Sequence, residues 1–313
     1  MSSGPPAGSP ADPFESLVEP FLFDGASQGS TPELQLLPSQ HASGRSRAAG
    51  TIASDAVWVC SADLEVIAGS VAGNGDADPR QVAAGWVQRG LALARERRLS
   101  VVLEGRFRSP VLVAGIVRLF GDAGYRTSLT AVAERWAEVR MSDASFRFDA
   151  LRRGRADANR EVVDRVDLPA IVGTADVNRV TVLDRTGSVV SEGERGSDEY
   201  VRAPSALEDA AAERLGTMRS TLWLSQLRRM TRFAGELRMA PRWAVDELID
   251  LHEVALSEIV PELPIPAGSE TMRVQVERLT ATLTALRRAV QDDAADLAAP
   301  AVVLQPDGRT VIR

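Results

Sequence analysis

Short apolar runs, separated by stretches with helical spacing, most constrain the fold of this 313-residue chain. The runs at residues 21–23, 56–60 and 100–103 each end at a turn or a polar residue, and none alternates between apolar and polar positions. Such runs are typical of strands that are buried on both faces of a parallel sheet. Helical spacing occupies residues 78–98 and, after the third run, 110–123. This rhythm predicts an α/β fold with a doubly wound sheet and right-handed crossovers.

Further along the chain, residues 125–132 predict another strand. Residues 180–183 and 188–190 predict a β-hairpin, because the turn sequence DRTG joins two apolar runs. From these elements we expect three regions: a disordered tail at 1–13, an α/β domain at 14–200 and a helical region at 201–313.

The C-terminal region is predicted to hold three helices. The first begins at a capping box around Ser205 and runs to about Met239. The second runs from Pro241 to just before Pro261, and the third begins near Ser269. The apolar residues of the third helix alternate spacings of four and three, which predicts packing along the first helix or, alternatively, a dimer. These residues are Met272, Val276, Leu279, Leu283, Leu286 and Val290.

Composition narrows the function. A single cysteine, Cys60, cannot form an internal disulfide, and there is no run of about 18 apolar residues to span a bilayer. No basic and apolar leader opens the sequence, so we expect a cytoplasmic protein. The net charge of -7 disfavours nucleic acid as a partner. All 36 basic residues are arginine, so no mechanism that needs lysine can operate from this chain alone.

The stretch DGASQGST at residues 24–31 comes close to the phosphate-loop pattern G-x-x-x-x-G-K-[ST]. Gly29 and Thr31 match it, whereas Asp24 stands at the first glycine and Ser30 at the lysine. In such a loop, backbone N–H groups and the lysine bind polyphosphate, and the final hydroxyl binds Mg²⁺. By itself the match favours an ordinary turn. As a nucleotide site it would comprise Asp24, Gly25, Ala26, Ser27, Gln28, Gly29, Ser30 and Thr31, with Thr31 as the metal ligand.

Other motifs follow in an order that is more informative than any one of them. They are VWVCSAD at 57–63, VVLEGR at 101–106, GYR at 124–126, RFD at 147–149, GR at 154–155 and VTVLDRTG at 180–187. Over roughly residues 20–192 this order resembles the zeta-toxin family. The resemblance implies a P-loop kinase fold that phosphorylates UDP-N-acetylglucosamine on its sugar, using ATP and Mg²⁺.

The resemblance also implies roles for single residues. The family's catalytic base falls on Ser61, and the surviving Asp63 could replace it only if the strand end shifted. Glu104 stands in the family's substrate-binding motif, and Arg106 replaces the threonine of that motif. Arg147 falls near one of the two arginines that clamp phosphate.

Arg155 falls near the second phosphate-clamping arginine, and Arg152 or Arg153 could take its place. With serine at both the lysine and the base positions, we expect little phosphoryl transfer. Arg45 or Arg47 could supply the missing cation, although a guanidinium differs in shape from an ammonium.

Three hypotheses remain open. The first is a catalytically impaired zeta-toxin-like protein with a binding or regulatory role. The second is a working nucleotide-sugar kinase that uses Asp63 and an arginine. The third is a helical oligomerising scaffold. Residues 205–297 could bind a helical antitoxin-like partner, form a homo-oligomer or cover the nucleotide site in cis. His41 and His252 are far apart, so no metal site is expected at the histidines.

Overall fold

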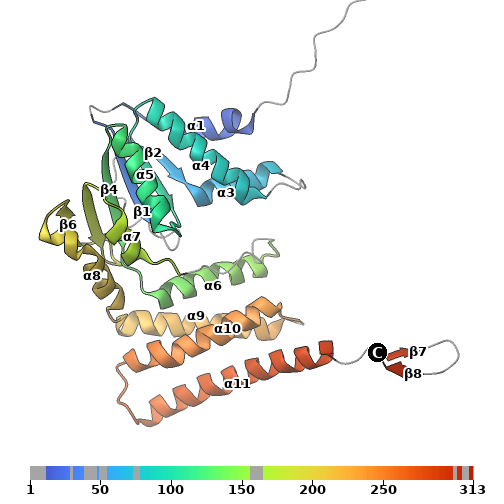
Figure 1. The fold of residues 1–313 in the computed structure, drawn as a ribbon. Helices are drawn as coiled ribbons and strands as arrows, with labels where there is room; N and C mark the ends of the chain where they lie inside the picture. The colour runs from blue at the N-terminus through green and yellow to red at the C-terminus, as the bar shows by residue number, and fades with distance from the viewer. Residues whose placement is uncertain are drawn as a thin grey trace, which may run out of the picture. The chain divides into compact units, whose positions relative to one another are not determined.

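A computed structural model gives the fold of the chain (Figure 1). Its contacts divide the chain into two compact units. Unit 1 comprises Met1–Arg135 and Asp164–Glu213, and unit 2 comprises Trp136–Val163 and Arg214–Arg313. The residues that the structure describes are 12–28, 31–38, 48, 55–72, 78–155, 165–237, 239–298, 302–304 and 310–312.

Unit 1 is built on a six-stranded sheet with the order β2-β3-β1-β4-β5-β6. The first five strands in this order are parallel, and β6 is antiparallel to β5. The predicted α/β class with a parallel, P-loop kinase-like sheet is therefore confirmed. The strands are β1 (Glu33–Pro38), β2 (Val57–Cys60), β3 (Val101–Gly105), β4 (Arg126–Val132), β5 (Arg179–Leu183) and β6 (Val189–Glu194).

The helices of unit 1 begin where short-range capping predicts. Asp78 accepts a hydrogen bond from the backbone of Arg80 before α4, and Ser109 accepts one from Leu112 before α5. The helices expected at 78–98 and 110–123 are confirmed. The helical elements are η1 (Phe14–Val18), α1 (Glu19–Phe23), α3 (Ser61–Ala72), α4 (Pro79–Glu96), α5 (Pro110–Asp122), α7 (Leu168–Thr174) and α8 (Asp198–Ala212).

The predicted hairpin is formed by β5 and β6. The Asp184 carboxylate accepts hydrogen bonds from the backbone N–H groups of Thr186, at 2.7 Å, and Ser188, at 2.9 Å. These bonds close the turn, and Gly187 supplies its positive φ of 89°. The Thr186 hydroxyl also donates to Asp184, and this bond, followed by the backbone bonds, lowers the pKa of that carboxyl.

The strand predicted at residues 21–23 is wrong. These residues close α1, where Pro20 lies in the first turn, Leu22 is buried and Phe21 is 53% exposed. The first strand is β1, which was not predicted because the polar residue Gln35 interrupts its apolar run. Gln35 is buried, and its amide donates a 3.0 Å hydrogen bond to Thr130 on β4. A buried amide is tolerated in a central strand when a neighbouring strand satisfies it.

Unit 2 is helical. Its elements are α6 (Trp136–Arg152), α9 (Gly216–Glu236), α10 (Arg242–Val254), η4 (Ala255–Ile259), η5 (Val260–Glu262) and α11 (Glu270–Ala298). The short strands β7 (Val302–Leu304) and β8 (Thr310–Ile312) pair with each other near the C-terminus. The domain boundary expected at residue 200 falls inside α8, and α6, which precedes it in the chain, belongs to unit 2.

The single helix predicted from Ser205 to Met239 is wrong, because two helices occupy this stretch. α8 begins after Ser197, whose hydroxyl accepts from the backbone of Tyr200, so Ser205 lies inside a helix. α9 begins at Gly216, where a φ of 73° breaks the chain direction. The predicted second helix, beginning after Pro241, is confirmed as α10.

The third C-terminal helix is confirmed as α11, but its main neighbour is α10 rather than α9 (Figure 1). Leu279 and Leu283 of its apolar seam are buried, and Arg287 forms a 2.6 Å ion pair with Glu253 of α10. Val276, also in the predicted seam, is 36% exposed. Of the apolar stripe expected on the first C-terminal helix, Leu237 is half-buried at the end of α9, and the other four residues are buried in the same core. These four are Trp223, Leu227, Met230 and Ala234.

Candidate phosphate-binding edge of the sheet

The carboxyl end of β1 lies at the switch point of the sheet. From β1 the chain leads to β2 on one side, and from β4 it leads to β5 on the other side. In open α/β sheets, ligands bind outside the carboxyl ends of the strands where the connections diverge in this way. The edge of the sheet after β1 is therefore the candidate site.

Two of the predicted site residues meet at this edge. Glu104 of β3 lies in register between Leu37 and Cys60, and Pro38 pairs with Gly105. A side-chain carbon added to Gly105 would lie 3.2 Å from the hydroxyl of Ser61, the first residue of α3. Ser61, at the position of the family's base, and Glu104, the glutamate of the substrate motif, thus lie next to the end of β1.

A buried carboxylate marks the site. Glu104 is only 4% exposed, and its Oε2 accepts a 3.0 Å hydrogen bond from the indole Nε1 of Trp58 on β2. Burial, with a smaller contribution from the charges of Glu104 and Asp63, raises the pKa of the Cys60 thiol to about 11, although hydrogen bonds from the backbone of Asp63 and Ala62 oppose this rise. Cys60 is therefore a neutral, buried thiol at ordinary pH, as its place at the strand end predicts.

Asp63 and Arg106 flank this cluster. Asp63 lies in the first turn of α3 and is half-buried, whereas Arg106 follows β3 and is exposed. Asp63 lies near enough to the Cys60 thiol to influence its pKa. A carboxylate is thus present at this edge, two residues from the position where the family has its base.

The segment 24–31 lies at the opposite end of β1. It leaves α1 and enters the sheet at the amino end of the strand, whereas a phosphate loop leaves a strand at its carboxyl end. The Ser27 hydroxyl donates to Asp55, and the Gln28 amide donates to the carbonyl of Arg97. A phosphate loop at this segment would need a strand directly before it, and helix α1 precedes it instead. Gly29 and Ser30 lie outside the described residues.

Arg147 belongs to the core of unit 2. It is 2% exposed, its guanidinium forms a 3.0 Å ion pair with Glu247, and it stacks over the ring of Trp243. Glu247 also pairs with Arg140 at 2.7 Å, so two arginines share one buried carboxylate. A phosphate clamp needs an accessible guanidinium, and in this structure that of Arg147 is occupied. Arg155 is exposed just beyond the end of α6.

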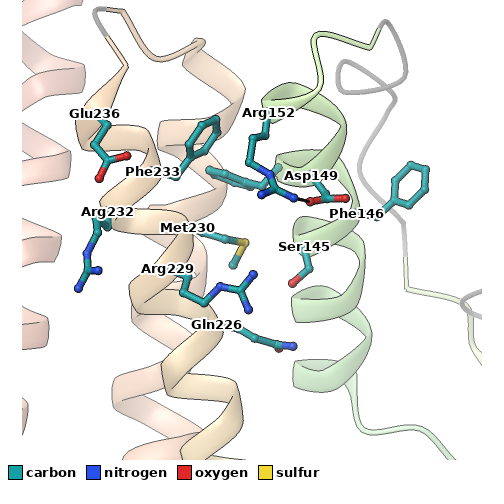
Figure 2. Close-up of a pocket in the computed structure, with 11 residues that line it drawn as sticks. Ser145, Phe146, Asp149, Arg152, Gln226, Arg229, Met230, Arg232, Phe233 and Glu236 are labelled. Carbon is teal, nitrogen blue, oxygen red and sulfur yellow. Dashed lines mark hydrogen bonds and ion pairs between the residues drawn. The ribbon is translucent and has the colours of Figure 1, made fainter.

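The two alternatives to Arg155 are also paired. Arg152 and Arg153 form ion pairs with Asp149 at 2.5 Å and 2.7 Å. Arg152 and Asp149 line a groove of about 540 Å³ between α6 and α9 in unit 2 (Figure 2). The groove combines apolar residues, including Met230 and Phe233, with charges of both signs, so its composition alone does not favour one class of ligand.

The segment that directly follows β1 was not recognised in the sequence. Residues 39–46 read SQHASGRS, which matches G-x-x-x-x-G-K-[ST] at Gly44 and Ser46 and carries Arg45 at the lysine position. The apolar residues of β1 could have indicated a strand directly before this segment, but Gln35 interrupts their run. Residues 39–47, and with them His41 and Arg47, lie outside the described residues. Ala48 just after them is helical and fully buried with Leu37.

The rest of the described chain holds no competing metal centre. Over these residues, no group of three or more histidine, cysteine or acidic side chains is placed to hold a metal ion. His252 is buried in α10, where its Nδ1 donates to the carbonyl of Leu248 at 2.7 Å. It is a packing residue. No helix among the described residues is both long and apolar enough to span a bilayer.

A solved structure shares this architecture. A chain of the PezAT chromosomal toxin–antitoxin system of the human pathogen Streptococcus pneumoniae matches 72% of this chain and 98% of its own length, with a TM-score of 0.57 and 12% identity. The chain has a zeta-toxin-like fold. A chain of the AvrRxo1-ORF1:ORF2 complex covers 82% of this chain and 80% of its own, with a TM-score of 0.31 and 13% identity. No family model and no curated protein matches the sequence.

Proposed function

We propose that this zeta-toxin-like protein binds a nucleoside triphosphate with Mg²⁺ through residues 39–47 and transfers its phosphate poorly. One observation carries the proposal: the strand at the centre of the sheet ends at Pro38, directly before the SQHASGRS sequence. Ala48, which is helical, follows Pro38 after nine residues, enough to hold the eight-residue pattern G-x-x-x-x-G-K-[ST].

The residue types in this segment suit the ligand. Gly44 allows close approach of the backbone to phosphate, and the Ser46 hydroxyl would hold Mg²⁺. Arg45 would meet the β- and γ-phosphates in place of lysine. A guanidinium keeps the positive charge of an ammonium but spreads it over a planar fork, so it retains binding better than it retains transition-state geometry. Bound ATP would supply the phosphoryl group.

Transfer is expected to be slow because the base position holds Ser61. A positioned general base contributes roughly 10² to 10⁴ in rate, and a serine hydroxyl does not act as a base near neutral pH. By resemblance, the acceptor would be the sugar hydroxyl of UDP-N-acetylglucosamine, with Glu104 contacting it. The proposed role is therefore nucleotide-dependent binding or regulation rather than rapid turnover.

A calorimetric titration with ATP·Mg²⁺ tests the proposal. The wild type is expected to bind, and Arg45→Ala to bind roughly 10- to 100-fold more weakly, because a hydrogen bond to a charged group contributes about 1.5–3 kcal/mol. Ser30→Ala, which alters the segment at the other end of β1, is the matched control and should bind like the wild type. Loss of binding in Ser30→Ala with none in Arg45→Ala would reverse the assignment.

A second candidate function is an active nucleotide-sugar kinase. The observation that favours it is the half-buried carboxylate of Asp63 in the first turn of α3, next to the position of the base. Mg²⁺-dependent conversion of UDP-N-acetylglucosamine by the wild type, abolished in Asp63→Asn, would support this function. Equal turnover by wild type and Asp63→Asn would reject Asp63 as the base.

A partner protein is the remaining part of the proposal. The similar Streptococcus pneumoniae chain comes from a toxin–antitoxin system. On that likeness alone, we propose that this chain has an antitoxin-like helical partner. Covering of the nucleotide site by residues 205–297 stays a prediction. A rise in affinity for ATP·Mg²⁺ when unit 2 is destabilised would support it, and an unchanged affinity would contradict it.

A further inference from the structure

The groove within unit 2 has an apolar base. It lies between α6 and α9, and its volume of about 540 Å³ is within the range of roughly 300–1,000 Å³ that is typical of small-molecule sites (Figure 2). Among its lining residues, Phe148 of α6 and Met230 of α9 are buried, and Phe233 of α9 is half-buried. A ligand in this groove would therefore contact apolar side chains from both helices.

Aromatic contacts hold the Phe233 ring in place. Its centroid lies 6.4 Å from that of Phe148, and the two rings are inclined at 73°. Phe148 in turn packs edge-to-face on Trp243, with a centroid distance of 5.5 Å and an angle of 71°. Edge-to-face contacts are a favourable arrangement of aromatic rings. Because Phe148 is held between two rings and Phe233 is not fully covered, Phe233 offers a preorganised apolar surface to a planar ligand.

The pairing of the charges around the groove distinguishes its possible ligands. Asp149, the acidic lining residue on α6, already forms ion pairs with Arg152 and Arg153. Glu236, the acidic lining residue on α9, points away from α6, as does Arg232 (Figure 2). The negative charges of the lining are thus either paired or directed away from the space between the helices.

The two helices present donors that are available to a ligand. Arg229 and Gln226 extend from α9 into the space toward α6 (Figure 2). Over the described part of the chain, neither side chain makes an ion pair or a hydrogen bond. On α6, the Ser145 hydroxyl lies 3.8 Å from the sulfur of Met141, which is a weak acceptor, so this hydroxyl can donate to a ligand instead. A positive charge and two neutral donors therefore face an apolar base.

A single unpaired guanidinium suits a carboxylate. The planar fork of Arg229 matches the two oxygens of a carboxylate, and the two groups carry equal and opposite charge. A phosphate dianion would need a second positive charge, and Arg152, the lining arginine on α6, is paired with Asp149. Because the base of the groove is apolar and aromatic, we expect the rest of the ligand to be a planar apolar ring.

We propose that this groove binds a small aromatic carboxylate, with the ring against Phe233 and the carboxylate at Arg229 and Gln226. Ser145 donates to the carboxylate from the opposite helix. The groove lies entirely within unit 2 and shares no residue with the nucleotide site proposed above. The two proposals can therefore fail independently.

Calorimetric titration of the full chain with 2-naphthoate tests the proposal. Saturable binding is expected, and 2-naphthamide, which keeps the ring but lacks the charge, should bind roughly 10-fold more weakly or worse. 2-Naphthyl phosphate should also bind more weakly than the carboxylate. An absence of saturable 2-naphthoate binding overturns the proposal, as does equal binding of the amide. Tighter binding of the phosphate would overturn the choice of a carboxylate.

Two neighbouring arginines of α9 provide a variant and its matched control. Arg229→Ala should weaken 2-naphthoate binding by roughly 10- to 100-fold, because a charged hydrogen-bond donor is lost. Arg228→Ala should bind like the wild type, since the Nε of Arg228 donates to the carbonyl of Leu224 within the same helix. Equal binding by the wild type and Arg229→Ala would overturn the site, and so would an equal loss in both variants.

Photolabelling with 4-azidobenzoate locates the ligand independently of the variants. After illumination of the full chain, attachment is expected within residues 145–152 or 226–236, and an excess of 2-naphthoate should suppress it. Mass spectrometry of the digested chain identifies the labelled peptides. Labelling that 2-naphthoate suppresses at other residues would place the site outside this groove and overturn the proposal.

Discussion

The two units use buried charge in different ways. In unit 2, Glu247 is 3% exposed and is held by two guanidinium groups, those of Arg140 and Arg147. In unit 1, Glu104 is similarly buried, but it lies at the open carboxyl edge of the sheet and accepts a hydrogen bond from the neutral indole of Trp58. One carboxylate is enclosed by helices, whereas the other lies where α/β proteins bind ligands.

In unit 2 the guanidinium of Arg147 is buried and paired with Glu247. Burial by itself lowers the pKa of Arg140, and the hydrogen bonds and charges of Glu247 and Asp250 outweigh it, so that the pKa is raised. The charges of this network are thus satisfied within unit 2. We infer that variants in this network change stability, and that variants at the sheet edge change ligand binding.

The largest effect is expected for Arg147→Ala. Removing one partner of a buried ion network leaves the other charge poorly compensated and typically destabilises a protein by about 3–5 kcal/mol. Urea denaturation of the full chain, followed by tryptophan fluorescence, measures this loss, and the affinity for ATP·Mg²⁺ should not fall. Arg232→Ala is the control, because Arg232 has no ion pair among the described residues. Weaker nucleotide binding with unchanged stability would restore Arg147 as a clamp.

The next effect compares the observed first strand with the one that the sequence predicted. Leu36→Ala removes a fully buried side chain of β1 and should lower the free energy of unfolding by about 2–5 kcal/mol. Phe21→Ala removes a side chain that is 53% exposed, so its loss should be smaller. Chemical denaturation of both variants gives the ranking, and the reverse order would contradict the placement of β1.

A smaller effect is expected for Trp58→Phe. The substitution keeps the aromatic ring but removes one hydrogen-bond donor to buried Glu104, which should destabilise unit 1 by about 1–3 kcal/mol. In a Glu104→Leu background the same substitution should have little effect, and the difference between the two gives the coupling energy. Equal losses in both backgrounds would mean that the hydrogen bond contributes nothing.

The smallest effect is a pH dependence from His252. Burial lowers its pKa below the ordinary value of 6.5, although the hydrogen bond with the Leu248 carbonyl raises it. Below about pH 6.5 the unfolded chain therefore binds a proton that the folded chain does not, and stability falls as the pH is lowered. Unfolding free energies of wild type and His252→Gln, compared between neutral and mildly acidic pH, measure this difference. A wild type that loses no more stability than the variant would rule out His252 as the source.

Local signals in the sequence agree with several elements whose donor and acceptor are close along the chain, although the capping box expected at Ser205 lies inside α8. Asp78 and Ser109 begin α4 and α5, and Asp184 closes the hairpin, each through a bond that spans two to four residues. The order of the strand-end motifs likewise predicted the zeta-toxin-like sheet. Ser61 and Glu104, taken from that order, do lie together at its carboxyl edge.

The sequence by itself thus determined the fold class, most of the helices and the strand ends that carry Ser61 and Glu104, whereas the loop it favoured, residues 24–31, lies at the other end of β1. The tertiary structure alone decided which strand is first and that the guanidinium of Arg147 is occupied. Gln35 is compatible with a central strand only because Thr130, 95 residues away, accepts its hydrogen bond. Arg147 is occupied only because Glu247, 100 residues away, pairs with it. Interactions over such separations leave no local pattern, because they depend on which elements the fold brings together.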